Sequence, residues 1–303
     1  MRVYLLAMFI SFPPSSVQAH VVAEPGSQAW RDWHPDIWTL AAVLLTVVLY
    51  LVGLIRLWRG SGVGRGVGSA SAACFLAGAA MLLVALASPL ERMAGALLTA
   101  HMVQHVILIA VVPPLIVLGR PEVVFAFALP RRARRGAALN SGIRGLARTL
   151  RPLVRPLPAA LIHGAAVWIW HAPGLFQAAL SNAVLHDLEH VSFFSTGFAF
   201  WYATLLSVRS PTALIAGIVG IVVTLIHGGL MGALMTLTPT VLYPAYEHST
   251  AAFGLTPIED QQLAGLIMWV PAGAIYLIAG LYLAACLLDV TQRRSRKVRV
   301  GSE

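Results

Sequence analysis

The sequence predicts an all-α integral membrane protein, a bundle of seven transmembrane helices, and two observations lead to this prediction. Of the 303 residues, 58% are hydrophobic and only 11% are charged, whereas about 25% of the residues in soluble domains are charged. Apolar runs near the ~20 residues that cross a bilayer follow one another with short connections. These runs cover residues 36–58, 69–88, 97–119, 157–171, 187–208, 212–236 and 262–288. Residues 20–303 are therefore expected to form a single polytopic membrane domain.

The first 19 residues are typical of a cleavable secretory signal. They contain Arg2, a short apolar core, a pair of prolines and the small-x-small ending Val17-Gln18-Ala19. We expect cleavage after Ala19, which leaves His20 as the mature N-terminus. The alternative is an uncleaved first anchor, but the apolar core is shorter than a span requires.

The basic residues predict the orientation of the bundle. With seven spans, the basic loop 130–156 and the basic tail 290–303 fall on the same side of the membrane. Lysine and arginine are enriched on the cytoplasmic side, so the mature N-terminus is expected outside and the C-terminus in the cytoplasm. The net charge of +9 is interpreted mainly as this orientation signal. Membrane lipid is then the expected partner of the basic loop, and no nucleic acid is expected.

Histidines occupy the outer halves of the predicted spans. His101 and His105 stand four residues apart at the outer start of the third run, and His186 and His190 repeat this spacing in the fifth. Residues four apart share one face of a helix, and ionisable groups within spans usually face a cavity, a partner or a bound ion. Two such pairs at one depth predict a metal or haem site. For an isolated histidine such as His163, a hydrogen bond to a neighbouring helix is the competing interpretation.

The sixth run adds His227 and Met231, again four residues apart. Imidazole with thioether is a ligand set suited to copper, Cu(I) in particular, although a buried methionine is also a common packing residue. Asp187 and Glu189 flank the second histidine pair and are interpreted either as partners that orient the imidazoles or as solvated acids. The predicted metal ligands are His101, His105, His186, His190, His227 and Met231. The predicted outer rim includes Asp260, Gln261, Met268 and Trp269.

Four motifs in order resemble a known family. They are HMVQHVILIAVVPPLIVLGRP from residue 101, DLEHVSFF from residue 187, HGGLMGALMTLTPTVLYPAY from residue 227 and DQQLAGLIMWVPAG from residue 260. Together they resemble the seven-span CtaG-type cytochrome c oxidase assembly factors over the third to seventh runs. The residues that match the family pattern are His101, Gln104, His105, Glu189, His190, His227, Asp260, Gln261, Met268 and Trp269.

The resemblance implies a multi-pass protein of the bacterial plasma (inner) membrane that helps to assemble a haem-copper oxidase. Copper is the metal it implies, with oxidase subunits and other copper-delivery proteins as partners. Zinc and haem stay open as alternative ligands, because both also accept imidazole. A non-covalent haem electron carrier and a metal or small-solute transporter are the rival functions. The sequence shows no nucleophile triad, phosphate loop or paired carboxylates, so no enzymatic activity is expected.

Overall fold

The computed structural model describes residues 36–130, 132, 142, 145, 148–149, 151–206 and 210–300. The described residues form helices and no strand, which confirms the predicted all-α class. The predicted signal peptide, His20 and most of the predicted basic loop lie outside the described residues.

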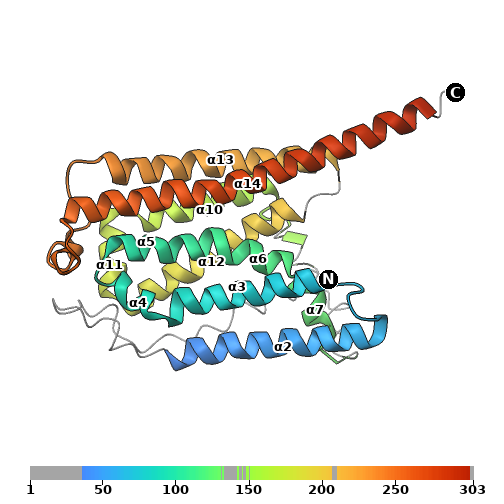
Figure 1. Cartoon of the computed structure of the whole chain (residues 1–303), viewed down its shortest axis with the longest axis horizontal. Coiled ribbons are helices and arrows are strands. Elements are labelled where there is room, and N and C mark those ends of the chain that lie inside the picture. Colours follow the sequence, from blue (N-terminus) through green and yellow to red (C-terminus); the bar gives the residue numbers. More distant parts are fainter. Residues whose placement is uncertain are drawn as a thin grey trace.

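The long helices run side by side along one direction. Figure 1 shows α13 and α14 on one side of the bundle, α2 and α3 on the other, and α5, α10 and α12 between them. The short helices α4 and α11 lie at one end, which is the end predicted to face outward and is called the outer end below. The elements are α2 (Ile37–Ser61), α3 (Ser69–Ala87), α4 (Pro89–Ala94), α5 (Leu98–Val106), the π-helical η1 (Ile107–Val111), α6 (Val112–Leu118), α7 (Pro121–Ala128), α10 (Pro156–Trp170), α11 (Pro173–Ser181), α12 (Ala183–Leu205), α13 (Pro211–Leu237), the 3₁₀ turns η2 (Pro244–Tyr246) and η3 (Thr250–Phe253), and α14 (Pro257–Val300).

Local sequence signals set where these helices begin. Six of them, α4, α7, α10, α11, α13 and α14, start with proline, whose missing amide hydrogen costs nothing at that position. Asp36 caps α2 by accepting hydrogen bonds from the amides of Trp38 and Thr39. Asn182 caps α12 in the same way, so this helix begins at Ala183 and not at the predicted residue 187.

Five helices are long and apolar enough to cross a membrane: α2, α3, the combined stretch Leu98–Leu118, α13 and α14. The pair α10 and α11 passes the same criterion together, with a bend of 72° between the two helices. Helix α12 does not pass, because its outer half is polar, and it packs against α6, α10 and α13 inside the bundle. The chain is thus a multi-pass membrane protein with five or six candidate spans. The seventh span and the orientation stay predictions.

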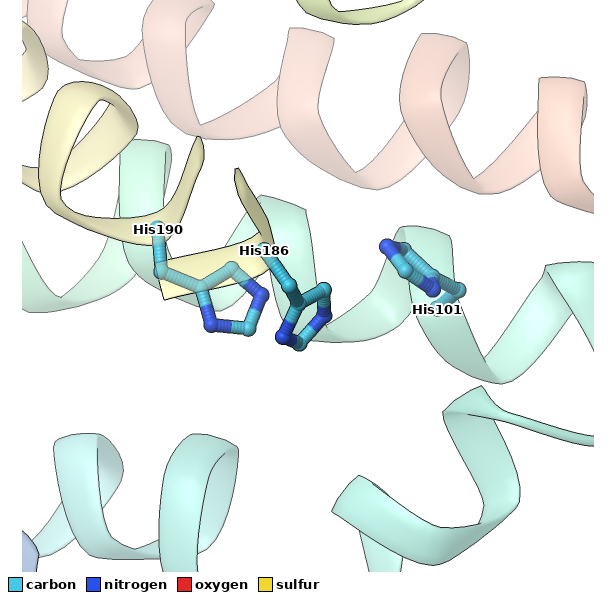
Figure 2. A group of neighbouring side chains, drawn as sticks. All are labelled: His101, His186 and His190. Carbon is cyan, nitrogen blue, oxygen red and sulfur yellow. The ribbon is translucent and has the colours of Figure 1, made fainter. Parts of the chain in front are cut away.

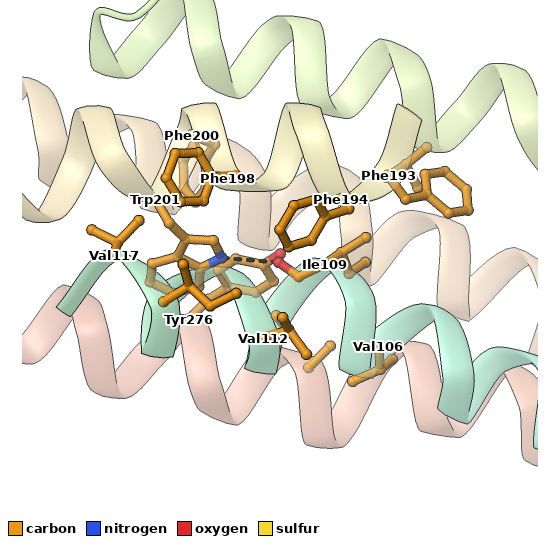
Figure 3. Packing of buried hydrophobic residues seen from close by; sticks show 14 of the residues in the cluster. Val106, Ile109, Val112, Val117, Phe193, Phe194, Phe198, Phe200, Trp201 and Tyr276 are labelled. Carbon is orange, nitrogen blue, oxygen red and sulfur yellow. Dashed lines mark hydrogen bonds between the residues drawn. The ribbon is translucent and has the colours of Figure 1, made fainter. Parts of the chain in front are cut away.

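The third span changes from α-helix to π-helix in its middle because of two prolines. Pro113 and Pro114 have no amide hydrogen to donate to the carbonyls one turn earlier, and the turn Ile107–Val111 widens just before them. The carbonyl of Ile109 instead accepts a hydrogen bond of 2.9 Å from the indole of Trp201 on α12 (Figure 3). The proline pair therefore fixes how α12 docks on the third span.

Helices α13 and α14 approach each other closely at a pair of glycines. A Cβ atom at Gly232 would lie 2.7 Å from the carbonyl oxygen of Gly265, which no side chain tolerates. Small residues allow this kind of contact between membrane helices. It fixes α14 against α13, and α14 also packs against α5 near the outer end.

Candidate metal site

Five buried histidines meet at the outer end of the bundle. His101 and His105 come from α5, His171 ends α10, and His186 and His190 come from α12. Figure 2 shows His186 and His190 on α12 extending toward His101. The ring centroids lie 4.3 Å apart for His101 and His105, 4.1 Å for His186 and His190, and 5.4 Å for His105 and His171. Three separate helices thus bring five imidazoles to one place.

Two overlapping groups within this cluster have the spacing of metal ligands. The first is His101, His186 and His190, and the second is His101, His105 and Glu189. Within each group the potential ligand atoms all lie within 4.8 Å of one another. Nitrogens that bind one ion at about 2.0 Å stand roughly 3.3 Å apart, so modest ring rotations are enough to bind an ion. His101 belongs to both groups and is therefore the centre of the site.

Hydrogen bonds fix which ring nitrogen carries the proton in two of these histidines. Nδ1 of His171 lies 2.8 Å from the carbonyl oxygen of Val167, which can only accept, so Nδ1 donates and Nε2 holds the lone pair. Nδ1 of His101 lies 3.0 Å from the hydroxyl oxygen of Tyr246, whose proton goes to the carbonyl of Ala94. Donation by Nδ1 satisfies all of these contacts and leaves a lone pair on Nε2 of His101. This pattern, with one nitrogen anchored and the other available, is the usual one for metal-binding imidazoles.

His105 and Glu189 form a close pair inside the site. Both side chains are fully buried, and Nε2 of His105 lies 3.7 Å from Oε1 of Glu189. Both ring nitrogens of His105, both oxygens of Glu189 and Nε2 of His171 have no hydrogen-bond partner among the described residues. Buried polar atoms are almost always paired, so this concentration of unpaired donors and acceptors indicates a site for a bound group. A cation fits it, because the site offers imidazole lone pairs and one carboxylate.

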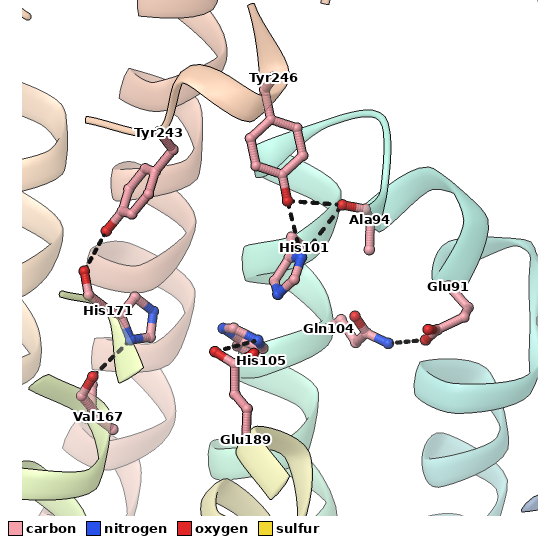
Figure 4. Close-up of polar contacts among 10 residues, drawn as sticks. All are labelled: Glu91, Ala94, His101, Gln104, His105, Val167, His171, Glu189, Tyr243 and Tyr246. Atoms are coloured by element: carbon pink, nitrogen blue, oxygen red, sulfur yellow. Dashed lines mark hydrogen bonds and ion pairs between the residues drawn. The ribbon is translucent and has the colours of Figure 1, made fainter. Parts of the chain in front are cut away.

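Polar contacts around the cluster hold it in place (Figure 4). The side-chain amide of Gln104 donates to the carbonyl of Ala85 at 2.9 Å and to the carboxyl of Glu91 on α4. The hydroxyl of Tyr243 donates to the carbonyl of His171 at 2.8 Å. Burial raises the pKa of Glu91 to about 8, so this carboxyl is protonated at neutral pH. The loop after α13 and the turn before α5 therefore cover the cluster on its outer side.

Two of the predicted rim residues hold helix ends and loops. The carboxylate of Asp260 accepts hydrogen bonds from the amides of Leu98 and Thr99 at 2.7 and 2.9 Å, so α14 caps the start of α5. The side-chain oxygen of Gln261 accepts from the amide of Leu242 at 2.7 Å. Asp260 thus positions the turn of α5 that carries His101, and Gln261 anchors the loop after α13.

The structure places several other predicted residues outside the two ligand groups. His227 belongs to neither group and lies against Gly164 on α10, beside His163. Met231 and Met268 are buried in the hydrophobic core. Trp269 is 44% exposed and packs against the glycines of α13. Asp187 is partly buried and close enough to Glu91 to affect its charge.

Sequence reasoning missed three contributors to the site. His171 joins the cluster although it has no partner at helical spacing, and its place at the outer end of the fourth run is the signal that could have identified it. Tyr246 binds His101 from a loop with no helical pattern. Phe176 on α11 lies 5.0 Å from His101 by ring centroids, and it reaches the cluster because α11 bends back toward it.

The described chain is thus a helical membrane protein with a buried histidine and carboxylate cluster at one end. A family model described as cytochrome c oxidase caa3 assembly factor (Caa3_CtaG) matches residues 48–289, and the chain belongs to this family. It is also 26% identical over 246 residues to "Uncharacterized protein Mb0105" of Mycobacterium bovis and, equally, to "Uncharacterized protein MT0111" of Mycobacterium tuberculosis. These alignments cover 78% of this chain but 36% of each relative, so the chain spans about a third of their length. No solved structure matches.

Proposed function

We propose that the protein is a membrane assembly factor for a haem-copper cytochrome c oxidase, and that it binds copper in the histidine cluster and aids its delivery to the oxidase. Family membership supports the role in oxidase assembly. The observation that carries the copper step is the group of five buried imidazoles with Glu189. Among the described residues, His105, Glu189 and Nε2 of His171 have no hydrogen-bond partner there. In this proposal copper is cargo, and oxidase subunits and other copper-delivery proteins are the partners.

The composition of the cluster supports copper binding and suits transient storage. Imidazole nitrogens bind copper and zinc alike, and the oxidase that this family serves requires copper. The cluster contains more nitrogen donors than one ion needs, and its two ligand groups share His101. An ion can therefore exchange ligands within the cluster without leaving it, which favours release to a partner over permanent retention.

Copper binding by the purified full-length protein tests this proposal. We expect the detergent-solubilised protein to bind Cu(I) under anaerobic conditions, and His101→Ala combined with His105→Ala to remove the copper held by the cluster. His248→Ala is the matched control, because His248 is exposed and stands in the outer loop. Unchanged copper content in the double variant would end the copper proposal. A Soret band in the purified protein would instead support the rival function of a haem carrier.

The oxidase itself provides the test of the assembly role. In a strain without the gene, we expect the oxidase to be poor in copper but to retain its haem. Complementation with the wild-type gene should restore the copper, and complementation with the His101→Ala/His105→Ala gene should not. An oxidase that lacks haem and contains normal copper would contradict the proposal.

A further inference from the structure

A second pair of histidines lies deeper in the bundle, away from the outer cluster. His163 lies in the middle of α10 and is fully buried, and His227 on α13 lies against Gly164, the next residue of α10. A Cβ atom on Gly164 would lie 3.0 Å from Nε2 of His227, so the ring of His227 fills the space that this glycine leaves open beside His163. His163 stands eight residues before His171 on the same helix, or ~12 Å further into the bundle.

The proton position on His163 follows from its hydrogen bonds. The hydroxyl of Thr196 on α12 donates its single proton to the carbonyl of Ser192 at 2.7 Å. The contact of 3.0 Å between Nδ1 of His163 and this hydroxyl oxygen must therefore be donated by Nδ1. Nε2 of His163 consequently holds a lone pair, and it is buried with no hydrogen-bond partner among the described residues. His171 shows the same arrangement in the outer cluster.

His227 also offers ring nitrogens without a partner. Both of its nitrogens are buried, and neither has a hydrogen-bond partner among the described residues. No hydrogen bond joins the two rings among the described residues. Two imidazoles that merely stabilise helix packing would be expected to bind each other or a neighbouring hydroxyl through every nitrogen. The unpaired nitrogens instead indicate an ion between the two helices.

We propose that His163 and His227 form a second, inner metal site, which binds one Cu(I) ion through Nε2 of His163 and a ring nitrogen of His227. The charge of the surroundings selects a monovalent ion. Among the described residues no carboxylate hydrogen-bonds to either ring, so a divalent cation would carry uncompensated charge in an apolar environment. The outer cluster differs in this respect, because a carboxyl group, that of Glu189, is one of its possible metal ligands. The inner site is a separate proposal that does not require the outer cluster to bind copper.

Stoichiometric titration of the purified full-length protein tests the inner site. We expect two Cu(I) ions per wild-type chain in an anaerobic titration against a Cu(I) chelator, one of them lost in the His163→Ala/His227→Ala variant. The His101→Ala/His105→Ala variant should retain the inner ion, with two nitrogen ligands visible by X-ray absorption at the copper edge. Zn²⁺ should not fill the inner site. Wild-type stoichiometry in the His163→Ala/His227→Ala variant would overturn the proposal, whereas full binding by the His101→Ala/His105→Ala variant would instead count against the proposed function.

Two milder variants keep the test decisive if the double variant does not fold. Thr196→Val removes the acceptor that orients His163 and should weaken the inner site by about 10- to 100-fold. Thr224→Val is its control, because the hydroxyl of Thr224 bonds only to its own helix at Gly220. Gly164→Ala should displace the ring of His227 and abolish the inner ion, whereas Gly228→Ala meets nothing within 4 Å and should not. Equal Cu(I) affinity in each variant and its control would refute the inner site.

Discussion

The two halves of α12 bury opposite kinds of side chain. The outer half contributes His186, Glu189 and His190 to the cluster, and both carboxyl oxygens of Glu189 have no hydrogen-bond partner among the described residues. The inner half contributes Phe198 and Trp201, with the indole nitrogen of Trp201 bonded to Ile109. Burying unpaired polar groups is unfavourable, so the apolar half must supply the stability that keeps the polar half in place. Function and stability are thus divided along one helix.

The two halves of α12 also differ in the side chains that they contact on neighbouring helices. The inner half of α12 stacks on α14, where the rings of Trp201 and Tyr276 lie 5.2 Å apart at an angle of 6°. The outer half faces α5 through imidazoles, with ring centroids 5.7 Å apart for His101 and His186 and 5.9 Å for His105 and His190. Phe193 contacts His171 at the end of α10. If this division is correct, substitutions of the buried aromatic residues Phe198 and Trp201 should change stability and leave metal binding intact. Substitutions that disturb the buried polar residues near the outer end should change both.

The largest stability effect is expected at Trp201. Trp201→Ala removes a buried side chain and leaves the carbonyl of Ile109 without a donor, and we expect the free energy of unfolding in detergent to fall by about 3–5 kcal/mol. Val184→Ala on the same helix is the control, because Val184 is 55% exposed and its loss should cost about 0.5 kcal/mol or less. Copper per folded chain should be unchanged in both variants. Reduced copper in folded Trp201→Ala would show that the two halves are not independent.

A smaller loss of stability, together with a loss of Cu(I) affinity, is expected at Asp260. Asp260→Ala removes the cap from the start of α5 and should cost about 0.5–2 kcal/mol of unfolding free energy. The affinity for Cu(I) should also fall, because His101 lies in the first turn after that cap. Gln262→Ala, an exposed neighbour on α14, is the control. Loss of stability with unchanged Cu(I) affinity would show that α5 does not need Asp260 to position His101.

Much of the fold could be predicted because a membrane span requires a long apolar run. The runs at 36–58, 69–88 and 212–236 correspond to helices with ends within three residues of the prediction. The two prolines at positions 113 and 114 could have predicted the π turn, since they remove two amide donors. The run at 187–208 was predicted as a span, but helix α12 is not among the candidate spans of the structure, because its outer half contains polar residues that burial inside the bundle allows.

The histidine pairs at four-residue spacing could be predicted from the sequence, but their partners could not. Helical spacing shows that His101 and His105 share a face, and that His186 and His190 do. Which faces meet depends on how the helices pack around one another, which spacing along the chain does not determine. The predicted place of His227 in the outer group rests on its depth, its spacing to Met231 and the family pattern, whereas the packing of α10 against α13 places its ring against Gly164, next to His163 in the chain. His171 was missed for the same reason.

At the outer end, Glu91 is expected to make the free energy of unfolding depend on pH. Burial is the main cause of its pKa near 8, and Asp187 on α12 and Asp36 before α2 add to the rise, while the hydrogen bond from Gln104 opposes it. The folded state therefore binds a proton that the unfolded state releases near pH 4.5. The contribution of Glu91 to stability is complete below pH 4.5 and is lost as the pH rises through about 8.

Glu91→Gln should remove that dependence. The amide is neutral at every pH and still accepts a hydrogen bond from Gln104, so unfolding free energy at pH 5 should change by about 1 kcal/mol or less. Unfolding curves between pH 5 and pH 9 should fall with pH for the wild type and be flatter for Glu91→Gln. Glu259→Gln, an exposed acid on α14, should keep the wild-type slope. An unaltered slope in Glu91→Gln would show that Glu91 is not the group that titrates.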